Sequence, residues 1–116
     1  MGFEHLRVYQ AAMLLGVETD RIIAEIPGAK RTHVRDIVKH LLEAVNSIKH
    51  NVAEGNDSRY PGTRDQFFDI ARGSGKEARS GFRSLVECGA TTPNRAYRAI
   101  GLTMVIDKML RGMSTK

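Results

Sequence analysis

Hydrophobic residues along this chain recur at steps of three and four positions, the spacing that places them on one side of an α-helix. The pattern is interrupted at Pro27-Gly28, across residues 55–62 and at Thr91-Thr92-Pro93. These breaks leave four segments of helical length. None of them alternates apolar and polar residues as a half-buried β-strand does. The sequence therefore predicts an all-α protein of four helices, organised as a single domain over residues 1–116.

Two of the segments begin with capping residues. Thr63 and Gln66 have the spacing of a capping box, so we expect the third helix to begin at Thr63. Thr92 precedes Pro93, which suits the first position of a helix, and this pair predicts the start of the fourth. The second helix is expected over residues 31–54.

The two central segments each carry a single apolar side. In the third, glycines at positions 73, 75 and 81 interrupt the helix, where each costs up to about 1 kcal/mol relative to alanine. They indicate either a close approach by a neighbouring helix or subunit, or tolerated surface positions. The residues expected on the apolar side of the third segment are Phe67, Ile70, Ala71, Ser74, Ala78, Phe82 and Leu85.

The first and last segments are apolar on two sides. Positions 6, 9, 13 and 17 form one stripe of the first segment, and a second stripe lies about half a turn away. One stripe is enough for a four-helix core, so the pattern favours a homo-oligomer whose subunits meet through these two helices. The alternative is a pair of helices buried on all sides. The residues expected at the oligomer interface are Val8, Leu15, Ile22, Leu102, Ile106 and Met109.

Composition narrows the class of protein. No run of about 18 apolar residues is present, and the start of the chain does not resemble a secretory signal, so we expect a cytoplasmic protein without a membrane partner. Cys88 is the only cysteine, and we expect it to be buried. The net charge of +5 is uneven, at −2 over residues 1–26 and +4 over residues 93–116. An acidic first helix and a basic last helix would attract each other, within one chain or between subunits, and the positive excess favours a polyanionic partner.

A stripe of four basic residues follows the third segment. Arg72, Lys76, Arg79 and Arg83 share a narrow arc about 16 Å long, which we expect opposite the apolar side. Like charges at these spacings repel one another, and guanidinium groups bind phosphate oxygens in pairs of hydrogen bonds. The stripe predicts contact with nucleic acid; the alternative is a solvated face paired with neighbouring acidic residues. The same surface is expected to extend to Arg95, Arg98, Lys108 and Arg111.

Polar residues also recur within the second and third segments. A hydrolase could use serine with glutamate, but no histidine lies within helical reach of Ser74. We therefore expect these residues to set the register between helices, with no catalytic role. The histidines and the cysteine lack the spacing of metal ligands, so neither a metal nor a cofactor is expected. The members of this structural polar motif are Ser47, Asn51, Glu54, Gly55, Ser74 and Glu77.

Three stretches of the chain resemble the small four-helix-bundle proteins encoded in intervening sequences of bacterial 23S rRNA genes. The first, Phe3-Glu4-His5-Leu6-Arg7-Val8-Tyr9-Gln10, is similar to the family's opening F-x-x-L-x-V-(W/Y)-Q, and the others are residues 47–55 and 67–77. The chain departs from the family at Leu42-Glu43, where members often have a basic pair, and at Lys49, where they favour proline. The first departure weakens any nucleic-acid interpretation based on the second helix.

The resemblance implies an antiparallel up-and-down four-helix bundle that assembles into ring-like pentamers. Accessory proteins of diversity-generating retroelements share this fold and bind nucleic acid beside a reverse transcriptase. We therefore hypothesise a non-catalytic protein that binds nucleic acid, with structured RNA preferred to DNA, through the basic stripe. The alternative is a homo-oligomeric scaffold that contacts another protein, such as a polymerase, without binding nucleic acid itself.

Overall fold

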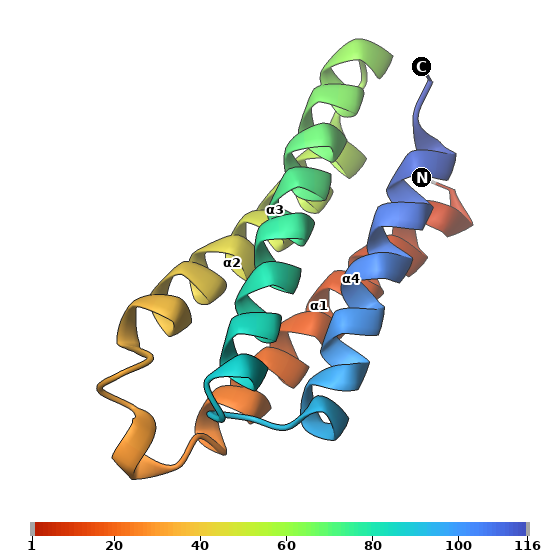
Figure 1. Cartoon of the computed structure of the whole chain (residues 1–116). Coiled ribbons are helices and arrows are strands. Elements are labelled where there is room, and N and C mark those ends of the chain that lie inside the picture. Colours follow the sequence, from red (N-terminus) through yellow and green to blue (C-terminus); the bar gives the residue numbers. More distant parts are fainter. Residues whose placement is uncertain (1, 116) are drawn as a thin grey trace.

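Four long helices make up the computed structural model, which describes residues 2–115 (Figure 1). No strand is present in this part of the chain. The prediction of an all-α protein with four helices is therefore confirmed. The helices are α1 Phe3–Ala24, α2 Arg35–Asp57, α3 Pro61–Glu87 and α4 Pro93–Met113, with a short 3₁₀ helix, η1, at Gly28–Lys30.

The helices lie side by side in a bundle that measures 48 × 22 × 19 Å (Figure 1). α1 leads away from the end that holds both termini and α2 returns to it, and α3 and α4 repeat this path. α1 packs against α2 and α4, and α3 packs against the same two helices; the contact between α2 and α3 is the most extensive. Each helix consequently has one side toward the bundle axis and one side facing outward.

The starts of the last two helices differ in how well their capping residues predict them. Thr92 caps α4 as predicted, since its Oγ1 accepts a hydrogen bond from the N–H of Arg95 at 3.2 Å. The prediction for α3 is wrong, because α3 begins at Pro61, two residues before Thr63. Proline is well suited to this first turn, where its missing N–H would have no helical partner.

The connections between helices consist of short turns and helix-capping motifs. Residues 28–34 form η1 and a turn, so α2 begins at Arg35, later than its hydrophobic pattern predicts. α3 is followed by its cap, Cys88, and then by a residue with positive φ, Gly89 at 76°. The N–H of Ala90 then donates to the carbonyl of Leu85 at 2.9 Å, the bond that defines a Schellman motif.

The core is built from the inner sides of all four helices, and its largest side chains are two phenylalanines of α3. Phe68, not the predicted Phe67, is the fully buried member of the adjacent pair, because it lies three positions before the buried Ala71. Ile70, also predicted to face the core, is exposed. The apolar side predicted for the second helix is buried at Leu41, Ala44, Val45, Ile48 and Val52.

Gly55 marks a close approach between α2 and α3. A Cβ added there would lie 2.6 Å from Cδ1 of Phe68, whose ring is buried in the core. At Gly81 an added Cβ would lie 3.2 Å from an α2 side chain, whereas nothing lies within 4 Å at Gly73 or Gly75. The close approach expected for the glycines of the third helix is therefore found at Gly81 and not, within this chain, at the other two.

Candidate interaction surfaces

A small polar cluster joins α2 to α3 beside the core. The hydroxyl oxygens of Ser47 and Ser74 lie 2.7 Å apart. Asn51 Nδ2 donates to the carbonyl of Ser47 at 2.8 Å and to its Oγ at 3.1 Å. Asn51 and Ser74 are buried, so these bonds satisfy groups that water does not reach. The geometry is consistent with a structural role, although Glu54 and Glu77 of the predicted motif are exposed and lie outside the cluster.

Four of the six residues predicted at an oligomer interface are at most 1% exposed and belong to the core of their own chain. They are Val8, Leu15, Ile22 and Ile106. The prediction is wrong for these four, because the stripes that contain them face the bundle axis. Leu102 and Met109 are partly buried and pack against the same core.

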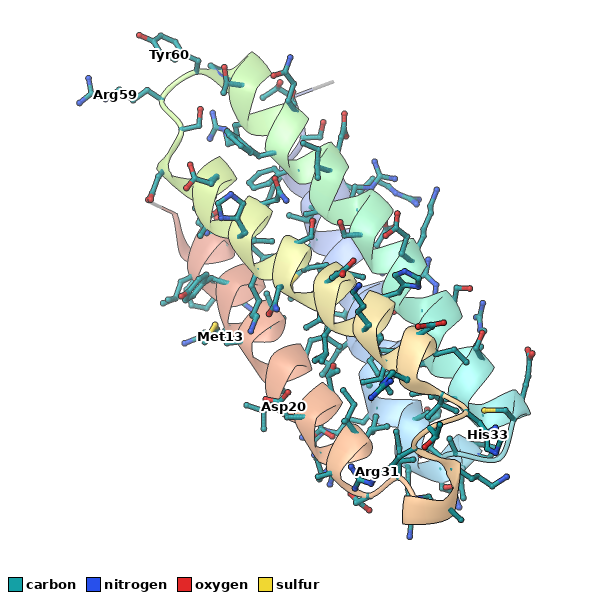
Figure 2. The ribbon with its side chains drawn as sticks, turned by 90° about the vertical axis from the view of Figure 1, so that its left-hand side faces the viewer. Met13, Asp20, Arg31, His33, Arg59 and Tyr60 are labelled. Carbon is teal, nitrogen blue, oxygen red and sulfur yellow. The ribbon has the colours of Figure 1, made fainter. Side chains whose placement is uncertain are left out.

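The other apolar stripe of α1 faces outward. Leu6, Tyr9, Met13 and Val17 are all exposed, Val17 to 63%. At about 100° per residue they lie opposite the buried side of the helix. Figure 2 shows Met13 and Asp20 projecting from the outer side of α1, away from the bundle. Contiguous apolar patches of this kind commonly mark interaction sites.

The outer face of α4 is also apolar, and it borders a groove. Tyr97, Met104 and Val105 are exposed, Tyr97 to 79%. The groove beside them has a volume of about 700 Å³, and Arg83 and Val86 of α3 form part of its other wall. Two consecutive helices therefore shape one concave apolar surface.

The basic stripe of α3 lies against the edge of α4 and not, as predicted, opposite the apolar side of its own helix. Arg72 Nε donates to Asp107 Oδ1 at 3.0 Å, and Arg79 Nη1 donates to Thr103 Oγ1 at 3.3 Å. Half of the stripe thus helps to hold α3 and α4 together. The two members that are exposed on the outer side are Lys76 and Arg83.

Two arginines predicted to contact nucleic acid join α4 to α1 and to Glu25, the residue that caps the end of α1. Arg95 Nε lies 3.4 Å from Glu25 Oε2, and Arg98 Nη1 lies 3.7 Å from Glu18 Oε1. The attraction expected between an acidic first helix and a basic last helix therefore acts within a single chain. The predicted contact residues without a polar partner in the described part of the chain are Lys76, Arg83 and Lys108.

Asp107 is the acidic centre of the contact between α3 and α4. It accepts hydrogen bonds from Arg72 and, at 2.9 Å, from Nη2 of Arg111. Burial by itself raises the pKa of this carboxyl, but the hydrogen bond from Arg72 and the charges of Arg72, Arg111 and Arg79 outweigh it. The pKa of Asp107 therefore lies below its usual range, and the carboxylate is ionised at neutral pH.

The remaining features to place are metal ligands, membrane-spanning helices and Cys88. Within residues 2–115, no three histidine, cysteine, aspartate or glutamate side chains are grouped so that they could hold a metal ion. None of the described helices has the length and apolar character needed to cross a membrane. Cys88, predicted to be buried, is exposed, because it caps the end of α3 at the tip of the bundle.

The groove is the feature that sequence reasoning missed. Tyr97, Gly101 and Val105 are four residues apart and share a face of α4, and a small residue between two large ones is a local signal for a hollow. The other wall comes from α3, however, and no local pattern shows which part of α3 lies beside α4.

The fold and surfaces define a class of protein: a small four-helix bundle whose first and last helices are apolar on two sides. The model of one family, described as 23S rRNA-intervening sequence protein, matches residues 4–112. The chain therefore belongs to this family, which confirms the resemblance seen in its three sequence stretches. No curated protein gives a significant match to the chain.

Proposed function

We propose that this protein is a homo-oligomeric scaffold, which acts by assembly and not by catalysis. The observation that supports the proposal is that α1 and α4 each expose an apolar outer face although the core is complete without it. Covering such a face contributes about 25 cal/mol per Å² of apolar surface removed from water. The antiparallel path of the helices leaves both faces on the long sides of the bundle, where copies can lie side by side. A ring of five subunits is the closed form that the family resemblance implies.

The contacts of the arginines favour assembly over nucleic-acid binding as the primary role. Most of the cations predicted to contact phosphate already have a partner within the chain, which lowers their capacity to bind another anion. Those with a side-chain partner are Arg72, Arg79, Arg95, Arg98 and Arg111.

Sedimentation velocity of the full chain, from low to high micromolar concentration, tests the proposal. We expect a defined species whose mass is a multiple of 12.9 kDa. A mass of 12.9 kDa at every concentration would overturn it.

Binding of nucleic acid is the second candidate function. Lys76, Arg83 and Lys108 are exposed and have no acidic partner among residues 2–115, and the chain has a net charge of +5. In an assembly the site would be repeated on every subunit, so that a weak contact gains by avidity. None of these residues is aromatic, so the contact would be with phosphates and helix shape and not by base stacking.

Fluorescence anisotropy of a structured RNA hairpin and a matched DNA duplex, at two salt concentrations, tests this second function. Binding through phosphates should weaken steeply with salt. The variant is Lys76→Glu with Lys108→Glu, which leaves the arginines that hold α3 to α4 in place. Arg35→Glu with Lys39→Glu on α2 changes the net charge equally and serves as control. Equal binding by both variants would exclude this surface as the site.

A further inference from the structure

The groove on α4 has the form of a site for an amphipathic helix. Its apolar wall on α4 runs from Pro93 to Val105, a length of about 18 Å at 1.5 Å per residue. Its rim carries two arginines, Arg83 and Arg98, and one carboxylate, Glu87. Arg98 shares the carboxylate of Glu18 with Arg21, so the net charge of this part of the surface remains positive. Helices bind such grooves through apolar residues spaced three and four apart.

The chain itself carries a helix face that matches this groove. From Leu6 to Val17, the outward stripe of α1 presents apolar side chains at steps of three and four residues over about 16 Å. Asp20 projects from the same side of α1 as Met13 (Figure 2) and has no partner in the described part of the chain. Length, spacing and charge on α1 are therefore complementary to the groove.

The stripe and the groove are separate surfaces of one molecule. The groove is lined by residues of α3 and α4, with none from α1. A contact that joins one to the other is heterologous: each copy uses a different surface from its partner, and both ends of a pair remain open to further copies.

Building on the proposed scaffold function, we propose that the occupant of the α4 groove is the α1 stripe of a second copy of this chain. The interface then lies along Leu6, Tyr9, Met13 and Val17 on one subunit and along Tyr97, Met104 and Val105 on the next. The acidic residue beside the stripe, Asp20, meets the positive rim of the groove.

Two double variants separate the halves of this contact. Met13→Lys with Val17→Lys alters the stripe, and Met104→Lys with Val105→Lys alters the groove. All four positions are exposed, so each variant should retain the helicity of the native chain and, at concentrations too low for assembly, its melting temperature. Ile70→Lys, at an exposed position of α3 outside both surfaces, is the matched control.

Sedimentation velocity and native mass spectrometry measure the outcome. For each double variant alone, the midpoint concentration for assembly should rise about 100-fold or more, so that it is monomeric at concentrations where the native chain assembles. Ile70→Lys should assemble as the native chain does. An equimolar mixture of the two variants should form a pair and nothing larger, because it contains only one intact stripe facing one intact groove.

The alternatives give different results. If the native chain assembles but either double variant alone does so equally well, the surface it alters is not part of the interface. If both variants are monomeric and their mixture is monomeric too, the contact is not between stripe and groove. In both cases self-assembly stands and this interface is overturned, whereas a monomeric native chain overturns the scaffold function itself.

Discussion

The central helices, α2 and α3, and the terminal helices, α1 and α4, have different roles in this bundle. α2 and α3 have their apolar residues on one side, meet at a glycine under a buried phenylalanine, and share a buried polar cluster. α1 and α4 contribute an inner stripe to the same core, are joined by arginine–glutamate pairs, and present a second apolar stripe to solvent. The central pair therefore fixes the register of the fold, and the terminal pair offers its surface to a partner.

This difference shows why apolar content alone does not define a core. Leu15 and Val17 are two positions apart on α1, yet Leu15 is fully buried and Val17 is 63% exposed. Substitutions on the two sides of the same helix should therefore have separable effects, on stability for the inner side and on association for the outer side.

The largest effect is expected on the inner stripe of α1. Leu15→Lys places a charge among the buried apolar side chains of the core, where it loses its hydration, and should lower the free energy of unfolding by more than about 4 kcal/mol. Circular dichroism during thermal unfolding measures this loss. Val17→Lys, on the outer stripe, should melt close to the native chain when both are measured at a concentration too low for assembly. If the Leu15→Lys protein melts normally and changes only in its sedimentation, Leu15 lies at the subunit interface and not in the core.

Close packing of α2 on α3 predicts the next effect. Gly55→Ala forces a methyl group against the buried ring of Phe68 and should cost about 1–3 kcal/mol in urea unfolding. Gly73→Ala is the matched control, because its Cβ meets nothing and alanine favours the helix by up to about 1 kcal/mol. If both substitutions stabilise the chain, the contact at Gly55 is looser than the structure shows.

The contact between α3 and α4 should be sensitive to acid. The pKa of Asp107 is lower in the folded chain than the usual value of about 3.9 in an unfolded chain. Its stabilising effect is therefore present above the unfolded pKa and lost as pH falls through the folded pKa. Asp107→Asn should cost about 1–2 kcal/mol at pH 7, and the difference from the native chain should shrink below about pH 4.

Melting temperatures measured from pH 7 to pH 3 test this expectation. Glu43→Gln removes an exposed carboxylate of α2 that has no partner in the described part of the chain, and should stay within about 0.5 kcal/mol of the native chain. A constant difference between Asp107→Asn and the native chain at every pH would show that the charge of Asp107 is not what stabilises the contact.

The smallest effect is expected in the polar cluster. Ser74→Ala removes one partner of Ser47, which keeps its bond from Asn51, so the loss should be about 0.5–1.5 kcal/mol. A double-mutant cycle with Ser47→Ala should give a coupling energy of at least about 0.5 kcal/mol. Ser80→Ala, at an exposed position of α3, controls for helix propensity. A coupling of zero would mean that the two hydroxyl groups do not act together.

Much of the local structure follows from short-range chemistry. The three- and four-residue spacing predicts four helices, Thr92 with Pro93 marks the start of α4, and the single stripe of α2 correctly predicts its buried side. These features depend on residues a few positions apart, so they can be predicted directly from the sequence. The shift from Phe67 to Phe68 shows where this kind of prediction fails. When two adjacent residues are apolar, either can face the core, and the two choices differ by a rotation of about 100° about the helix axis.

Where the local pattern allows two arrangements, the tertiary structure decides which of them is formed. By itself the sequence determined the helices, the two apolar stripes of α1 and α4, and the row of basic residues on α3. Which stripe is buried, and whether Arg72 and Arg79 face solvent or α4, depends on where the other helices lie. A stripe enters the core only where neighbouring helices cover it, and an arginine finds a carboxylate such as Asp107 only after residues 35 positions apart have been brought together.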